Sequence, residues 1–199
     1  FGKILRDFRL RKNLTQEEKI DNIRTLNKQA QNYATNNQLP NLLNNFNDVE
    51  KIIATAPAAE LATYNCEGFP EIRALLNLAN LTQYPLLDRK AMKFNGENLT
   101  LYFTTNTSSR KIQQIRKNNK VCLYFCLPKK FKGVSATGFI EEVTDLNIKK
   151  DFWQNGWEIY YPKGWQDDDY TLLKFTSVHL HCWFNFALHD FGKSLKDSN

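Results

Sequence analysis

The sequence has no long apolar run, no C-x-x-C pair and no internal repeat. Because a membrane-spanning helix needs about 18 consecutive apolar residues, we expect no contact with a membrane. No charged-then-apolar leader opens the chain, so the expected location is the cytoplasm. The cysteines are interpreted as reduced packing residues rather than disulfide partners. They are Cys66, Cys122, Cys126 and Cys182.

The 199 residues carry a net charge of +6, and the sequence pI is about 9.1. This length supports one domain with a substantial core, or one domain with an appendage. A positive net charge is compatible with nucleic acid or with a phosphate-bearing small molecule as binding partner. Since the charge is not gathered in one tail, we expect a small-molecule partner and do not expect nucleic acid.

The first part of the chain is predicted to be helical and polar. A capping box opens the helical pattern over residues 14–26. The Asn-rich residues 32–47 have the composition of turns and linkers. A further helix is expected to begin at Asn47 or Asp48 and to end before Pro57.

From residue 59 the pattern changes to short apolar strands separated by turns. One short helix is predicted over residues 108–118, and another follows Asp145 as its N-cap. We therefore predict a mainly β, α+β domain over residues 48–199, a small antiparallel barrel with a helical N-terminal extension over residues 1–47. The expected strands are 59–65, 71–80, 98–105, 120–128, 133–145, and one bent strand or two short ones over 170–184.

The stretch TNTSSRKIQQIRKN, residues 105–118, joins a predicted strand to a predicted helix. A helix start presents free backbone N–H groups and the positive end of the helix dipole. Ser109 can offer a hydroxyl, Arg110 a planar fork and Lys111 a mobile charge. Two interpretations remain open: a solvated helix start with a basic face, or a seat for a phosphate group.

Arg73 lies inside a predicted strand with apolar residues on both sides. Burying an unpaired guanidinium is costly, so this side chain needs solvent or a partner. It either reaches solvent from an edge strand or pairs with Glu71 or Glu60. Alternatively, it is a second cation for the same anion, brought close when the barrel closes.

Three segments in this order, EIRALLNL, LYFTTNTSSRKIQQIRKNNKVCLYF and GVSATGFIEEVTD, resemble the pyridoxamine 5′-phosphate oxidase-like flavoproteins. The stretches FWQNGWEIYYPKGWQDDDYTLLKFT and WFNFALHDF resemble the general-stress-protein and nitroimidazole-resistance-type branch. The resemblance covers about residues 48–192. It implies an FMN-binding split β-barrel, a homodimer with FMN at the subunit interface, and a flavin-dependent oxidoreductase with a small-molecule electron donor and acceptor.

The same resemblance implies ten cofactor-binding residues. Four would hold the FMN phosphate: Arg73, Ser109, Arg110 and Lys111. Two would lie beside the ribityl chain or the phosphate: Thr104 and Thr105. Three would run their backbone along the flavin ring: Ala74, Leu75 and Leu76. The tenth, Trp183, matches an aromatic position near the ring or the neighbouring subunit.

The sequence departs from the true pyridoxamine phosphate oxidases near its end, where His189 has no arginine beside it. Vitamin B6 oxidation is therefore not expected. No residue is an evident general acid or base, so the catalytic residues stay unknown. A non-enzymatic flavin or haem carrier, or a stress-linked binding protein, remains an alternative function.

Three other patterns in the second half of the chain favour structural roles or the edge of the site. His179 and His181 alternate on one side of a strand, but no carboxylate has suitable spacing, so we expect no metal site. Asp167–Asp169 read as a solvated loop before the last strand. Among the neighbouring aromatics, Tyr160 or Tyr161 is expected to edge the substrate mouth.

Residues 2–20, GKILRDFRLRKNLTQEEKI, resemble the first helix and the start of the second in a phage-repressor type of helix-turn-helix. A complete motif needs a tight turn and a basic recognition helix, and neither follows. We interpret the segment as an extension that packs on the barrel or on a dimer mate. A ligand-sensing regulator that uses these helices remains a further alternative.

Overall fold

The structure is a computed structural model that describes residues 38–87, 90–95 and 98–192. The chain divides into two compact units, residues 1–45 and 46–199, and the sheet belongs to the second. The predicted capping box and the repressor-like segment lie outside the described residues. Within the described part, no helix has the length and apolar character that a bilayer crossing requires.

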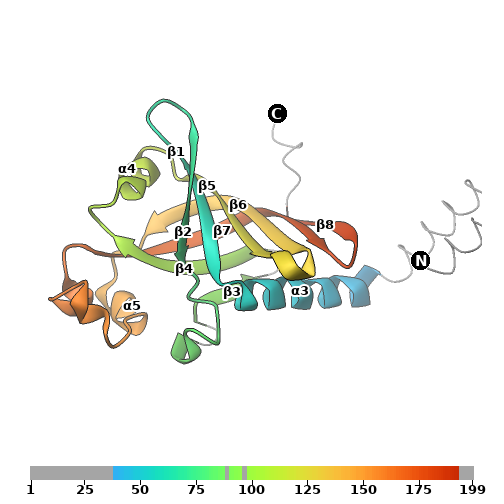
Figure 1. Cartoon of the computed structure of the whole chain (residues 1–199), viewed down its shortest axis with the longest axis horizontal. Coiled ribbons are helices and arrows are strands. Elements are labelled where there is room, and N and C mark those ends of the chain that lie inside the picture. Colours follow the sequence, from blue (N-terminus) through green and yellow to red (C-terminus); the bar gives the residue numbers. More distant parts are fainter. Residues whose placement is uncertain (1–37, 88–89, 96–97, 193–199) are drawn as a thin grey trace, which may run out of the picture. The chain divides into compact units, whose positions relative to one another are not determined.

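Eight antiparallel strands form one strongly coiled sheet that does not close (Figure 1). Its order is β2-β1-β5-β6-β7-β4-β3, with β8 paired to β7 outside this path. This confirms the predicted mainly β, α+β barrel-like fold. The strands are β1 (Ala58–Tyr64), β2 (Pro70–Leu76), β3 (Met92–Asn95), β4 (Asn98–Asn106), β5 (Lys120–Leu127), β6 (Lys132–Glu142), β7 (Tyr170–Phe184) and β8 (Ala187–Gly192).

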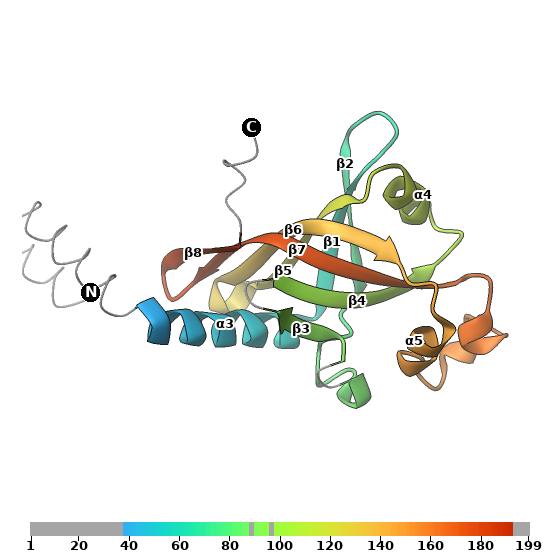
Figure 2. The same cartoon turned by 180° about the vertical axis from the view of Figure 1, so that it is seen from behind.

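Three α-helices accompany the sheet: α3 (Gln38–Thr55), α4 (Arg110–Lys117) and α5 (Leu146–Asp151). Helix α4 buries Ile112 and Ile115, as their spacing predicts. Asp145 caps α5 by accepting hydrogen bonds from the backbone N–H groups of Asn147 and Ile148. Seen from behind in Figure 2, α3 runs beneath the sheet, and α4 and α5 lie near the other end of the strands.

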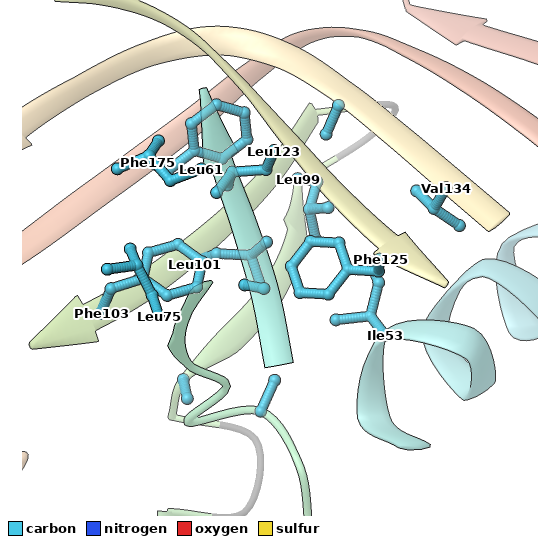
Figure 3. Close-up of a cluster of buried hydrophobic side chains, with 14 of the residues drawn as sticks. Ile53, Leu61, Leu75, Leu99, Leu101, Phe103, Leu123, Phe125, Val134 and Phe175 are labelled. Atoms are coloured by element: carbon cyan, nitrogen blue, oxygen red, sulfur yellow. The ribbon is translucent and has the colours of Figure 1, made fainter. Parts of the chain in front are cut away.

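The core forms where alternate residues of the coiled strands point inward. Figure 3 shows Phe125 beside Ile53 of α3, with Leu61 and Leu101 in the same cluster. All four are fully buried or nearly so. Burying a side chain of this size contributes about 1.5–3 kcal/mol, so this cluster carries much of the stability of the sheet.

Several boundaries differ from the predictions. Helix α3 begins at Gln38, so the Asn-rich residues up to 47 are partly helical rather than a linker. The helix after Asp145 ends at Asp151, and two short 3₁₀ turns follow. Gly156, which adopts a left-handed conformation with φ 95°, directly precedes the first of them. Strands β3 and β8 were not predicted at all.

Strand β7 is one continuous strand of 15 residues, and its Val178 is the extra residue of a bulge where the register with β6 shifts between Thr137 and Gly138. A Cβ at Gly138 would lie 2.1 Å from the carbonyl oxygen of Thr176, so only glycine fits this close approach. From His179 on, just past the bulge, β7 pairs with β8 as well as with β6.

Candidate functional site

A cavity of about 410 Å³ opens beside the junction of β4 and α4. This volume falls within the range of small-molecule sites, about 300–1,000 Å³. Six of the ten predicted cofactor residues line it: Ala74, Leu75, Leu76, Thr104, Thr105 and Lys111. The remaining wall consists of residues that the sequence did not assign to the cofactor: Pro57, Ala58, Asn106, Trp157, Tyr160 and Tyr161.

The turn between β4 and α4 is fixed by Asp169, which precedes β7. Its carboxylate accepts hydrogen bonds from the side chain of Asn106 at 2.6 Å and from the backbone N–H of Ser108 at 2.7 Å. Its carbonyl oxygen accepts a third bond from the N–H of Thr107 at 2.8 Å. These bonds lower the pKa of Asp169, with the bond from Asn106 contributing most. The predicted solvated loop therefore also anchors the start of α4.

Lys111 is the cation that reaches the cavity. Its Nζ donates a hydrogen bond to Oγ1 of Thr105 at 2.8 Å. Partial burial lowers the pKa of Lys111, and the nearby Arg73 guanidinium lowers it further. Among the described residues, no carboxylate lies within ion-pair distance of Lys111. A partly desolvated cation without a carboxylate partner is suited to an anionic ligand.

Arg73 adjoins this corner but is already well bonded. Its guanidinium donates to the backbone oxygen of Leu61 at 3.2 Å and to the hydroxyl of Thr63. It also contacts Oε1 of Gln114 at 3.0 Å and Oε2 of Glu71 at 3.3 Å. Of the two carboxylates considered from sequence, the partner is Glu71. Burial is the main cause of the lowered pKa of Arg73.

Arg110 behaves differently from its neighbour Lys111. Its side chain is 77% exposed, and Nη2 lies 3.3 Å from Oε2 of Glu71. It does not line the cavity. Glu71 thus bridges Arg73 and Arg110, and the hydrogen bond from Gln114 is the main cause of its lowered pKa. The predicted Arg-Lys pair is split, with one cation facing the cavity and the other facing outward.

Ser109 is the N-cap residue of α4, with φ −70° and ψ 145°. Its side chain makes no capping hydrogen bond. Its Oγ is buried and has no hydrogen-bond partner among the described residues. A buried hydroxyl without a partner, at the positive end of a helix, is the kind of donor that a bound anion would satisfy.

Aromatic side chains between α5 and β7 form the far wall of the cavity. Trp157, Tyr160 and Tyr161 line it. The sequence predicts that Tyr160 or Tyr161 lies at the mouth of the site, and both tyrosines are found in the cavity wall. The hydroxyl of Tyr161 donates to the side-chain oxygen of Asn106 at 3.4 Å, and burial raises the pKa of Tyr161. Tyr160 is 71% exposed and forms the rim.

Trp183 is not part of this cavity within one chain. It lies near the C-terminal end of β7, opposite Gly133 of β6 and Leu188 of β8. Tyr170, at the other end of the same strand, pairs with Asn106 of the cavity wall. Six of the ten predicted residues therefore line the cavity, whereas Arg73, Ser109 and Arg110 lie near Lys111 without lining it, and Trp183 lies at the other end of β7.

Comparison with known families and structures places the fold. The family described as pyridoxamine 5′-phosphate oxidase like matches residues 80–190, more than half of the chain. A solved structure from Clostridium acetobutylicum, a protein related to general stress protein 26 of B. subtilis (pyridoxinephosphate oxidase family), is 30% identical. That alignment covers 75% of this chain and 94% of the other, with a TM-score of 0.58.

Two further structures share the fold at lower identity. General stress protein 26 from Bacillus anthracis is 16% identical, with a TM-score of 0.50 and coverage of 71% of this chain and 97% of that one. A NimC/NimA family protein from Clostridium acetobutylicum is 17% identical, with a TM-score of 0.50 and coverage of 73% and 90%. No curated protein matches this chain. The family match and the 30% identical structure establish that this chain belongs to the pyridoxamine 5′-phosphate oxidase-like family.

Proposed function

We propose that this protein binds FMN in the cavity and acts as a flavin-dependent oxidoreductase on a small molecule. The observation that carries the proposal is Lys111, a partly buried cation in the wall of a cavity of about 410 Å³. Ser109, the N-cap residue of the same helix, adds a buried Oγ that has no hydrogen-bond partner among the described residues, although Ser109 does not itself line the cavity. A partly buried cation and a free hydroxyl at a helix start form a seat for a phosphate group.

The chemistry of the wall fits the rest of the cofactor. Thr104 and Thr105 supply hydroxyls beside the phosphate seat, where a polyol chain needs hydrogen bonds. The β2 residues Ala74–Leu76 supply backbone and small or apolar surface, which suits a planar ring. Arg73 adds positive charge next to Lys111. Arg110 is expected to contribute less, because it faces Glu71.

Bound FMN would supply hydride acceptance from a reduced nicotinamide and delivery to a second small molecule. The residues of this chain would bind, orient and shield it. Trp157 and Tyr160 would restrict access of water at the rim, and Tyr161 would hold Asn106 in place. None of the described cavity residues is a histidine or a carboxylate, so no proton-transferring residue is assigned.

We further propose that two copies assemble through the outward face of the sheet. This face carries exposed apolar side chains from several strands, among them Ile72 and Leu76 of β2, Tyr124 of β5 and Trp183 of β7. Leu76 also lines the cavity, so a dimer mate on this face would approach the ligand. Light scattering of the purified chain should give twice the monomer mass, and Ile72→Glu should reduce it.

We retain two proposals from the sequence. Residues 48–199 would form the FMN-binding domain, with residues 1–47 as its extension. The protein would be located in the cytoplasm. None of its four cysteines forms a disulfide, which is the state expected of thiols in a reducing compartment.

The test compares FMN with riboflavin, which lacks the phosphate. Lys111→Ala should weaken FMN at least tenfold and riboflavin by no more than threefold, as measured by flavin fluorescence quenching. Arg110→Ala should have a smaller effect on FMN. Arg116→Ala, at the other end of α4 and paired with Glu142, is the matched control and should change neither.

Equal losses of the two flavins in Lys111→Ala would show that this cation does not hold the phosphate. A purified chain that is colourless and takes up no FMN would overturn the cofactor proposal. A flavin-loaded chain that is neither reduced by a nicotinamide nor reoxidised by electron acceptors would be a carrier rather than an enzyme.

A further inference from the structure

Three side chains with metal-binding chemistry meet on the outward face of β7 and β8. They are His179, His181 and Asp190, and one ligand atom from each lies within 4.8 Å of the others. None of them lines the cavity described above. Within one chain the cluster is therefore not part of the cavity wall, and it lies on the same face of the sheet as Tyr124 and Trp183, through which we propose that two copies assemble.

The cluster exists because β8 pairs with β7. His179 and His181 are two residues apart on β7, so they share a face, and Asp190 is the cross-strand partner of His181. Sequence reasoning found no suitable carboxylate because β8 was not predicted. The tight turn at Asn185 and Phe186, with φ 52° and 59°, fixes the register that presents Asp190 on this face.

Both histidines already point at the same oxygen. His179 Nε2 lies 3.1 Å and His181 Nδ1 2.7 Å from Oδ1 of Asp190. Ligand atoms about 2.1 Å from a tetrahedral ion are about 3.4 Å apart, so these contacts need to open by less than about 1 Å.

The solvent exposure of this cluster and the side chains around it are also compatible with a bound metal ion. Asp190 is 55% exposed at its side chain, so the carboxylate can adjust and solvent can reach the cluster. The Nδ1 atom of His179 is buried and has no hydrogen-bond partner among the described residues, which leaves Nε2 as the nitrogen presented to a ligand. The β6 residues opposite the two histidines, Ser135 and Thr137, have small side chains.

We propose that His179, His181 and Asp190 bind one divalent transition-metal ion, with Zn²⁺ as the representative. Two imidazoles and one carboxylate form a donor set for Zn²⁺ and similar ions, whereas Ca²⁺ and Mg²⁺ prefer oxygen ligands alone. Three protein ligands leave at least one coordination position for water or for a donor from another molecule. The ion would also cross-link β8 to β7.

Calorimetric titration with Zn²⁺ alone tests this site. The full-length chain is first treated with a chelator and dialysed, and its flavin content is recorded separately. One saturable ion per chain is expected. His181→Gln and Asp190→Asn should each weaken binding at least tenfold. His189→Gln is the matched control, because the ring of His189 stacks on Phe184, 4.1 Å between centroids, on the other side of β8.

Thermal unfolding supplies a second readout. Zn²⁺ should raise the unfolding midpoint of the unmodified chain and of His189→Gln, because an ion that binds only the folded state stabilises it. It should not raise the midpoint of Asp190→Asn. His179→Gln provides a second variant if Asp190→Asn folds poorly. Unchanged Zn²⁺ affinity in His181→Gln and His179→Gln, or no saturable binding to the unmodified chain, would overturn the proposal whatever the flavin result.

Discussion

The carboxylate of Asp169 accepts a hydrogen bond from the backbone N–H of Ser108 at 2.7 Å, across 61 positions of sequence. This contact joins the loop before β7 to the turn before α4. The turn carries Ser109 and Lys111, the two residues on which the proposed phosphate seat depends. For the proposed FMN site, Asp169 would therefore be a positioning residue, which acts through the backbone of its neighbours.

Asp169→Asn should destabilise the fold by about 1 kcal/mol, because hydrogen bonds to a charged group contribute about 1.5–3 kcal/mol and solvent exposure reduces this. The affinity for FMN should fall more than that for riboflavin, since the start of α4 loses its anchor. Urea unfolding and flavin titration measure the two effects. Asp168→Asn is the control, because that side chain is 89% exposed and pairs with the exposed Lys163. Equal effects of the two variants would contradict the positioning role.

The same contact predicts how stability depends on pH. The pKa of Asp169 is lower in the folded chain than its ordinary value of about 3.9. Its contribution is therefore fully present above about pH 5 and is lost as the pH falls through 3.9 toward the folded value. The difference in unfolding free energy between the unmodified chain and Asp169→Asn should be constant from pH 5 to 7 and should shrink below pH 4. A difference that grows on acidification would contradict this assignment.

Much of the fold is visible in local sequence. Helix α4 follows from the spacing of Ile112 and Ile115, and α5 from the cap Asp145. The strands follow from alternating apolar residues, because the inward side chains of a half-buried sheet repeat every second position. The first turns of α3 were missed because their asparagines are typical of turns.

The contacts that complete the site are long-range and have no local signal. The sequence alone does not distinguish Glu71 from Glu60 as the ion-pair partner of Arg73. In the fold, strand pairing and a hydrogen bond from the side chain of Gln114 favour Glu71 as this partner. The cavity wall at Tyr161 comes from a segment of short turns rather than a regular helix. Asp190 could not be matched with the β7 histidines without β8, a six-residue strand after a turn that lacks glycine.

Gly138→Ala should be among the most damaging single changes in the sheet. The added Cβ would lie 2.1 Å from the backbone oxygen of Thr176 and 2.8 Å from the Cα of Ser177, and neither backbone atom can move cheaply. We expect a loss of about 3 kcal/mol or more, by analogy with overpacking of a core. Gly68→Ala is the comparison, because its Cβ would meet nothing within 4 Å. That change should cost only about 1–2 kcal/mol from its φ of +85°. Chemical denaturation of both variants gives the ranking, and similar losses would contradict the close β6–β7 approach.

Glu71→Gln tests whether the carboxylate that bridges Arg73 and Arg110 competes with a bound phosphate for these cations. Both guanidinium groups have an Nη2 atom 3.3 Å from the same Oε2 atom. Glutamine keeps a hydrogen-bond acceptor but removes the negative charge, so the corner becomes more positive. The ratio of FMN to riboflavin affinity should therefore rise several-fold, and the gain should shrink as salt is added. Glu67→Gln, in the exposed β1–β2 turn, should leave the ratio unchanged. A lower ratio in Glu71→Gln would instead show that Glu71 serves chiefly to hold Arg73 in position for the phosphate.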